Sequence, residues 1–268
     1  PARRRPMRVR IRFYQELNFF LKRDYEKRTV ETEAAEGQTV KDLIESFGVP
    51  HVEVDLILVH GEPVDFSYQV APGDCISVYP VFERLDISGI AGLRHKPLRT
   101  PRFLADVHLG TLARRLRFLG FYTEYSRKAG DEYLARRCSE EGLILLSRDR
   151  QLLMRRIVDR GLYIHSTDPF EQVREVVRRL DLYSSISPYS RCGSCSGELR
   201  SLPVEGPEWE KRKGEIPPGV RKWCSEYKVC RGCGKIYWRG SHFDSLAPLL
   251  EALERDRTQL EGEQSRNF

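Results

Sequence analysis

Two pairs of cysteines constrain this chain more than any other feature of its sequence. The pairs are Cys192-x-x-Cys195 and Cys230-x-x-Cys233, with 34 residues between them. Four thiolates in two such pairs are the ligand set of a tetrahedral structural zinc site. Because four sulfurs leave no open coordination position, we expect this zinc to stabilise the fold rather than to catalyse a reaction.

The other three of the seven cysteines are isolated in the sequence. An odd number of cysteines, in a chain whose first residues show no apolar secretory segment, argues against a disulfide framework and favours the cytoplasm. Cys224 is a rival zinc ligand, but it has no partner at x-x spacing, so the symmetric pairs are favoured. Gly193 and Gly232 lie inside the pairs, where we expect them to ease two tight turns.

The distribution of charge points to a polyanionic partner. The chain carries 45 Lys and Arg against 39 Asp and Glu, and residues 191–240 hold 11 basic and 6 acidic groups. Basic and aromatic residues alternate there, which suits phosphates and unstacked bases. The alternative is a solvated basic face with Trp238 in a small core. The candidate RNA-binding residues are Arg114, Arg115, Arg148, Arg150, Lys222, Arg231, Lys235, Trp238 and Arg239.

The segment from Met7 to Phe82 has the pattern of a small α+β domain. Apolar residues alternate with polar ones over residues 9–14, as in a half-buried strand. Thr39 is placed to cap a helix that Gly48 ends. Further extended stretches are expected around residues 28–33, 56–59 and 75–79. No apolar run in the chain approaches the length of a membrane span, so we expect no membrane partner.

Residues 102–182 alternate strand and helix signals, which predicts a parallel α/β sheet. The expected strands are 103–105, 121–125, 143–146 and 162–165. The expected helices are 109–119, 131–141 and 150–160, followed by one that opens at Asp168. Arg114, Arg115 and Arg117 lie off the apolar face of the first helix. A short helix is expected after Ser241, with a frayed tail from Glu254 onward.

Three acids stand near the ends of these strands. Asp106 and Asp149 follow predicted strands, and Asp131 opens the helix after another. Ligands of open parallel sheets bind beyond the carboxyl ends of the strands. Clustered carboxylates repel one another unless a cation neutralises them, and oxygen ligands suit Mg²⁺ or Mn²⁺, which can activate water against a phosphodiester. Helix capping is the alternative role for Asp131 and Asp149, as it is for Asp168.

The N-terminal segment resembles a known fold family. Residues 39–82, including VHGEPVDFSYQVAPGDCISVYPVF (59–82), look like the β-grasp, ubiquitin-like proteins related to bacterial sulfur carriers. Those carriers act through a free C-terminal Gly-Gly, whereas this chain continues past Phe82 and neither Gly89 nor Gly92 belongs to such a pair. The resemblance therefore implies the fold without the sulfur chemistry, and a docking or stabilising module.

The remaining motifs resemble the Mut-seven C-terminal RNase domain, which is similar to the PIN nucleases. They are RFLAD (102–106), LGTLARRLRFLGF (109–121), Asp131, ILLSRDR (144–150) and the cysteine pairs up to WRGSH (238–242). The resemblance covers roughly residues 101–246. It implies a metal-dependent ribonuclease with Asp106, Asp131 and Asp149 as its acidic cluster. PIN enzymes usually have a fourth acid, for which Glu132 and Asp168 are candidates; His242 could be a ligand, a base, or a capping or packing residue.

The sequence thus predicts an α/β protein with a PIN-like parallel-sheet domain, preceded by a β-grasp domain and followed by a zinc ribbon. The expected boundaries are a β-grasp domain at 7–83, a linker at 84–101, the PIN-like domain at 102–184, the ribbon at 188–246, and a C-terminal helix and tail at 247–268. The predicted function is hydrolysis of RNA, with tRNA or the ribosome as candidate partners. Asp106 and Asp149 would hold Mg²⁺ or Mn²⁺, and Asp131 would complete the cluster.

Two other functions stay open at this point. The first is a non-catalytic RNA- or ribosome-binding factor that keeps the fold and the zinc. The second is an adaptor or sulfur-transfer-related protein that acts through the β-grasp domain, which would then bind a protein partner.

Overall fold

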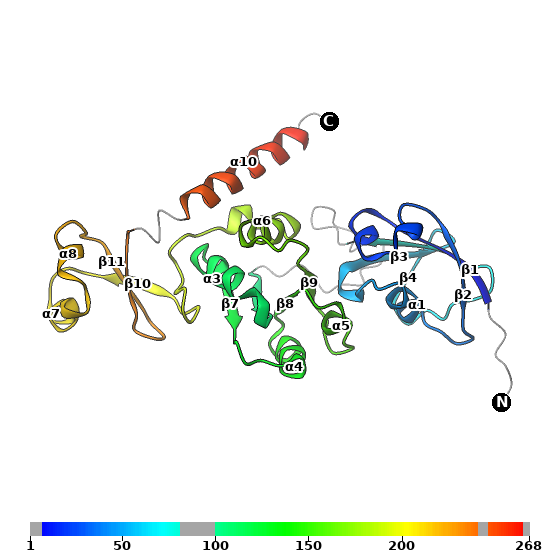
Figure 1. Cartoon of the computed structure of the whole chain (residues 1–268), viewed down its shortest axis with the longest axis horizontal. Coiled ribbons are helices and arrows are strands. Elements are labelled where there is room, and N and C mark those ends of the chain that lie inside the picture. The colour runs from blue at the N-terminus through cyan, green and yellow to red at the C-terminus, as the bar shows by residue number, and fades with distance from the viewer. Residues whose placement is uncertain (1–6, 81–99, 241–245, 265–268) are drawn as a thin grey trace. The chain divides into compact units, whose positions relative to one another are not determined.

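A computed structural model of the chain describes residues 7–80, 100–240 and 246–264 (Figure 1). The chain forms two compact units, one made of Pro1–Thr100 with Ala129–Tyr163 and the other of Pro101–Lys128 with Ile164–Phe268. Most of the expected linker at 84–101, and His242, lie outside the described residues. Within the described residues, no helix is both long and apolar enough to cross a membrane.

The N-terminal sheet has five strands in the order β2-β1-β5-β3-β4. They are β1 (Met7–Phe13), β2 (Val30–Ala34), β3 (Val54–Val59), β4 (Glu62–Val64) and β5 (Cys75–Pro80). β1 pairs in parallel with β5, and the other pairings are antiparallel. The predicted cap of α1 (Val40–Ser46) is confirmed, because Thr39 Oγ1 accepts a hydrogen bond from the Asp42 N–H at 3.1 Å. A mixed sheet with one α-helix, α1, among the described residues of this segment confirms the β-grasp fold class.

The middle of the chain forms a four-stranded sheet in the order β7-β6-β8-β9. Its strands are β6 (Arg102–Ala105), β7 (Tyr122–Tyr125), β8 (Ile144–Ser147) and β9 (Gly161–Tyr163). β6 and β7 pair in parallel, as do β8 and β9. The helices are α3 (Gly110–Phe118), α4 (Asp131–Glu141), α5 (Arg150–Leu153) and α6 (Pro169–Arg179). The predicted α/β class with a parallel sheet is confirmed.

Helix α5 is much shorter than the predicted helix at 150–160. It ends at Leu153, and the chain then turns so that the Val158 N–H donates to Arg155 O at 2.9 Å. Val158 is fully buried, and its carbonyl oxygen lies 2.9 Å from His51 Nε2. Tertiary contacts therefore override the expectation of a helix that continues to residue 160.

Helix α10 (Ala247–Gln264) is longer than predicted, because it continues through the part of the tail that was expected to fray. Two ion pairs hold that part. Arg257 Nε donates to Glu261 at 2.9 Å, one helical turn away. Arg174 of α6 makes a bidentate pair with Asp256, at 2.8 and 2.7 Å.

The ribbon is a three-stranded antiparallel sheet of β10 (Leu199–Leu202), β11 (Tyr227–Cys230) and β12 (Ile236–Trp238). The long insertion between the cysteine pairs carries the short helices α7 (Pro207–Arg212) and α8 (Pro218–Arg221). The hydrophobic core of the ribbon consists of Leu202, Ile216, Tyr227, Val229 and Ile236. This core is small, so the ribbon needs a further source of stability.

Candidate functional site

The sulfur atoms of the four paired cysteines all lie within 4.8 Å of one another. The Sγ atoms of Cys192 and Cys233 are 3.6 Å apart, and those of Cys195 and Cys230 are 3.4 Å apart. Tetrahedral zinc with Zn–S bonds of about 2.3 Å would set the sulfurs about 3.8 Å apart. A Cβ at Gly197 would lie 2.9 Å from Cys230 Sγ, so the backbone at Gly197 packs against the sulfurs and leaves no room for a side chain there. The cluster is suited to bind a structural metal such as zinc.

The two cysteine pairs have matching backbone geometry. After the first pair, the Ser196 N–H donates to Cys192 O at 2.9 Å; after the second, the Gly234 N–H donates to Cys230 O at 3.1 Å. Each pair is thus a closed turn that aims two sulfurs inward. Such paired turns present four sulfurs in a tetrahedral arrangement.

The glycines inside the pairs do not have the role that the sequence suggested. The left-handed positions are Ser196 (φ 65°) and Gly234 (φ 74°), each directly after the second cysteine of its pair. Gly193 is needed for close approach instead, since a Cβ there would lie 2.7 Å from the Phe118 ring. Gly232 meets only ordinary contacts. The prediction that Gly193 and Gly232 relieve turn strain is therefore wrong.

The thiols of the cluster differ in acidity. Burial disfavours the thiolate of Cys192, but hydrogen bonds from the Tyr237 hydroxyl and from the backbone lower the pKa of Cys192 to about 6. Burial raises the pKa of Cys195 to about 12, and it also raises the pKa of Cys233. Neighbouring thiolates repel one another, so a bound cation is needed for all four sulfurs to be deprotonated together.

Arg117 ties the first cysteine pair to the α/β domain. Its side chain is buried, and it donates to Gly193 O at 3.1 Å, Ser194 O at 2.9 Å and Thr123 O at 2.8 Å. Burial lowers the pKa of Arg117. Ser196 Oγ in turn accepts from the Thr123 N–H at 2.8 Å. Although Arg117 lies off the apolar face of its helix, three carbonyl acceptors make its burial possible.

Asp149 combines a structural role with an available oxygen. Its Oδ1 accepts from the N–H groups of Gln151 (2.8 Å) and Leu152 (3.2 Å), which confirms the predicted cap of α5. Its Oδ2 makes no hydrogen bond within the described residues. Asp168 caps α6 in the same way, through the N–H groups of Phe170 and Glu171. Capping and ligation are therefore compatible at Asp149.

The other two predicted acids have different surroundings. Asp131 is not a cap, because Gly130 occupies the N-cap position of α4; the Asp131 carboxylate is exposed and lies 3.8 Å from Arg155. Helix capping is therefore excluded as the alternative role of Asp131. Asp106 is 5% exposed, follows β6, and accepts from the Val107 N–H at 2.5 Å. Asp106 belongs to one compact unit, whereas Asp131 and Asp149 belong to the other.

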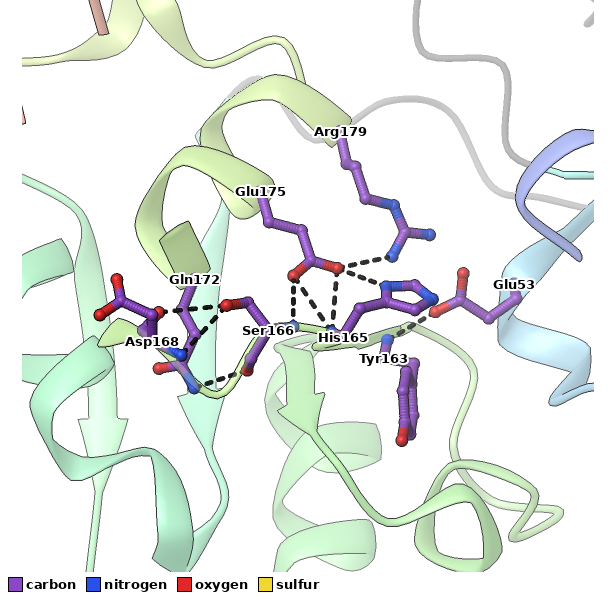
Figure 2. Close-up of polar contacts among 8 residues, drawn as sticks. All are labelled: Glu53, Tyr163, His165, Ser166, Asp168, Gln172, Glu175 and Arg179. Carbon is purple, nitrogen blue, oxygen red and sulfur yellow. Dashed lines mark hydrogen bonds and ion pairs between the residues drawn. The ribbon is translucent and has the colours of Figure 1, made fainter. Parts of the chain in front are cut away.

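A buried acid that the sequence analysis missed is Glu175 on α6 (Figure 2). Its carboxylate accepts from the backbone N–H groups of His165 (3.1 Å) and Ser166 (3.3 Å), and lies 2.5 Å from His165 Nδ1 and 3.8 Å from Arg179. Burial opposes its ionisation, but the hydrogen bonds from His165 prevail and lower the pKa of Glu175. Because Glu175 accepts several hydrogen bonds from His165 and Ser166, its role is structural: it holds the backbone that follows β9.

The predicted RNA-binding residues fall into two groups. Lys222, Arg231, Lys235 and Arg239 are exposed on the ribbon. Arg114 is exposed and stacks over Phe118 at 5.5 Å, while Arg115, Arg148, Arg150 and Trp238 are half-buried. Trp238 packs against the ribbon core. Trp223, one of the aromatic residues interleaved with the basic ones of this segment, is 60% exposed and follows two exposed basic residues, Arg221 and Lys222.

Cys224 stands apart from the metal cluster. It packs against the ribbon core, and its Sγ lies 3.4 Å from Glu226 O. Within the described residues it is not one of the four clustered sulfurs. The geometry therefore favours the symmetric pairs as the ligand set.

The molecule thus combines a β-grasp domain, a parallel α/β domain and a four-cysteine ribbon. Comparison with protein families agrees with this architecture. A family model for the Mut7-C RNAse domain matches residues 101–250, which is more than half of the chain, and one for Mut7-C ubiquitin matches residues 7–86. The chain belongs to the Mut7-C RNAse domain family. No curated protein matches the sequence significantly.

Proposed function

We propose that the protein is a metal-dependent ribonuclease. Membership of the Mut7-C RNAse domain family supports a nuclease. The observation that carries the metal dependence is Asp149, whose Oδ1 caps a helix while Oδ2 is left for a ligand within the described residues. In this proposal Asp149 and Asp106 hold Mg²⁺ or Mn²⁺, and Asp131 completes the cluster or orients water.

The position of the acids along the chain supports this assignment. Ligands of open parallel sheets bind outside the carboxyl ends of the strands. Asp106 follows β6 directly, and Asp149 follows β8 after one residue.

The chemistry follows from the residues. A bound divalent ion would supply charge stabilisation for the phosphodiester and activation of water. Asp149 would keep its orientation throughout, because its cap hydrogen bonds fix the carboxylate. Exposed basic groups on the ribbon, Lys222, Arg231, Lys235 and Arg239, would bind the phosphate backbone of the RNA. Zinc on the four paired cysteines would hold the ribbon folded and take no part in the reaction.

The test is cleavage of a labelled single-stranded RNA with and without Mn²⁺, by wild type, Asp149→Asn and Asp65→Asn. Asn can replace Asp both at a helix cap and in a turn, so both variants should fold. We expect Asp149→Asn to lose at least about a hundredfold in rate, as for loss of a charge that stabilises the transition state. Asp65 is an acid of the β-grasp domain whose Oδ1 accepts from the Ser67 N–H at 2.7 Å. It is not among the proposed ion ligands, so Asp65→Asn should cleave like wild type. RNA binding without Mn²⁺-dependent cleavage would instead support the non-catalytic binding factor.

A further inference from the structure

The loop that carries Asp149 is held by the β-grasp domain. The guanidinium of the next residue, Arg150, lies over three aromatic rings, with centroids at 5.9 Å for Phe19, 5.0 Å for Phe20 and 5.7 Å for Tyr163. Its Nη1 also donates to Phe20 O at 3.1 Å. A flat guanidinium among aromatic faces, with a hydrogen bond to a carbonyl, is a specific and partly desolvated contact.

Two buried polar side chains of the β-grasp domain hold the rest of this segment. His51 Nε2 lies 2.9 Å from Val158 O, and Glu45 contacts His51 Nδ1 at 2.7 Å. Glu53 Oε1 accepts from the Tyr163 N–H at 2.5 Å (Figure 2). His51 is 7% exposed and Glu53 is 1% exposed. Because a buried polar group without its partner is costly, these contacts should be persistent.

Close packing completes the contact at the end of the segment. A Cβ at Gly161 would lie 3.1 Å from Val52 Cγ2 of the β-grasp domain and 2.7 Å from Leu153 Cδ2 of α5. The β-grasp domain therefore touches the segment near its start at Arg150, in its middle at Val158 and at its end in β9. Helix α5 has only four residues and cannot be stable alone.

We propose that the β-grasp domain acts as an intramolecular brace that positions Asp149 for its ion, through Arg150. This proposal rests on the proposed function, because it takes Asp149 as an ion ligand. Arg150 is then a positioning residue rather than the RNA contact that the sequence suggested. The β-grasp domain serves the catalytic segment of its own chain and needs no sulfur chemistry to do so.

The first test measures order in the loop, without any activity. Hydrogen exchange of the Gln151 and Leu152 amides, which Asp149 caps, is compared in full-length wild type, Arg150→Gln and Arg156→Gln. Arg156 is exposed on the same segment, so its variant removes the same charge without touching the aromatic rings. We expect exchange about tenfold faster in Arg150→Gln, equivalent to losing one desolvated cation–π contact, and no change in Arg156→Gln. Unchanged exchange in Arg150→Gln would overturn the brace.

The second test separates positioning from RNA binding. In the cleavage assay, we expect Arg150→Gln to raise the Mn²⁺ concentration for half-maximal rate about tenfold, matching the lost contact, while the KM for RNA stays unchanged. Arg150→Lys keeps a cation over the rings and should restore part of the effect. The opposite result would be a raised KM for RNA with an unchanged Mn²⁺ requirement. The salt dependence of RNA binding would then also weaken by about one phosphate contact. That result would make Arg150 an RNA ligand and contradict the proposal.

The two tests also separate this proposal from the proposed function. If wild type shows no Mn²⁺-dependent cleavage, the ribonuclease assignment fails. If wild type cleaves and Arg150→Gln matches it in both Mn²⁺ requirement and exchange, only the brace fails.

Discussion

The β-grasp domain and the ribbon achieve a fixed structure by different means. The fully buried side chains of the β-grasp domain include Ile11, Phe13, Leu17, Leu43, Ile44, Ile57 and Ile76. The ribbon core has five buried residues, next to four sulfurs that converge on one point. A domain with a large apolar core can fold unaided, whereas a small one needs a metal or a covalent link. We therefore expect the folding of the ribbon, and not that of the β-grasp domain, to depend on a bound metal.

The largest effect is expected from removal of the metal. A strong chelator should unfold residues 190–240, because the binding energy of a structural zinc is also folding energy. Protection of backbone amides against exchange, followed by mass spectrometry, should disappear in the ribbon and persist in β1 and β5. Loss of protection in both regions at once would show that the β-grasp domain also depends on the metal.

The reverse experiment damages the apolar core. Phe13→Ala removes a fully buried ring and should destabilise the β-grasp domain by about 3–5 kcal/mol. Denaturant unfolding measures the loss, and metal analysis should still find one zinc per chain. If Phe13→Ala also releases zinc, the two regions are not independent.

Each of the two regions has an exposed aromatic residue, and the two have different surroundings. Phe19 is 52% exposed and contacts Arg150 of its own chain, whereas Trp223 is 60% exposed among basic residues. Trp223→Ala should weaken binding of single-stranded RNA without Mn²⁺ by about 1–3 kcal/mol, the value of one stacked base. Phe19→Ala is the matched control, and its RNA affinity should equal that of wild type. Equal affinities for all three proteins would exclude Trp223 as a stacking residue.

The smallest expected effect is a change in zinc affinity when the packing around the four sulfurs is disturbed. Gly197→Ala places a methyl group 2.9 Å from Cys230 Sγ and 3.3 Å from Cys195 Sγ, so these sulfur atoms must shift. Zinc affinity from competition with a chelator should fall about tenfold, the scale of a disturbed ligand environment. Gly214→Ala meets no atom within 4 Å and is the control. Identical zinc affinities would mean that the cluster has more freedom than its geometry indicates.

Much of the fold could be predicted from the sequence, because its signals are local. The alternation in β1, the Thr39 cap and the strand–helix order of the middle segment each depend on residues close together in the chain. The convergence of the cysteine pairs could be predicted as well, since the ligand spacing of a zinc site is itself a constraint on folding.

What escaped prediction depends on partners distant in sequence. Arg117 lies off the apolar face of α3, yet it is buried because Gly193 and Ser194 offer carbonyl oxygens more than 70 residues away. Arginine is a residue type that often contacts phosphate, but the guanidinium of Arg150 lies over the rings of Phe19 and Phe20. Helical periodicity reports which side of a helix is apolar, and it contains no information on which acceptors or rings another segment brings to the polar side.

In the proposed function, Asp106 and Asp149 hold a divalent ion on which RNA cleavage depends. The most direct measurement is a Mn²⁺ titration of the zinc-loaded full-length protein, with bound Mn²⁺ followed by electron paramagnetic resonance and the cleavage rate measured in the same samples. For wild type and Asp65→Asn, we predict that the rate rises in proportion to bound Mn²⁺. For Asp149→Asn, we predict that Mn²⁺ affinity falls at least about tenfold, since disturbing even the surroundings of a metal ligand costs that much, and that cleavage is lost. Full cleavage by Asp149→Asn, or a rate independent of bound Mn²⁺, would show that the acids do not hold a catalytic ion.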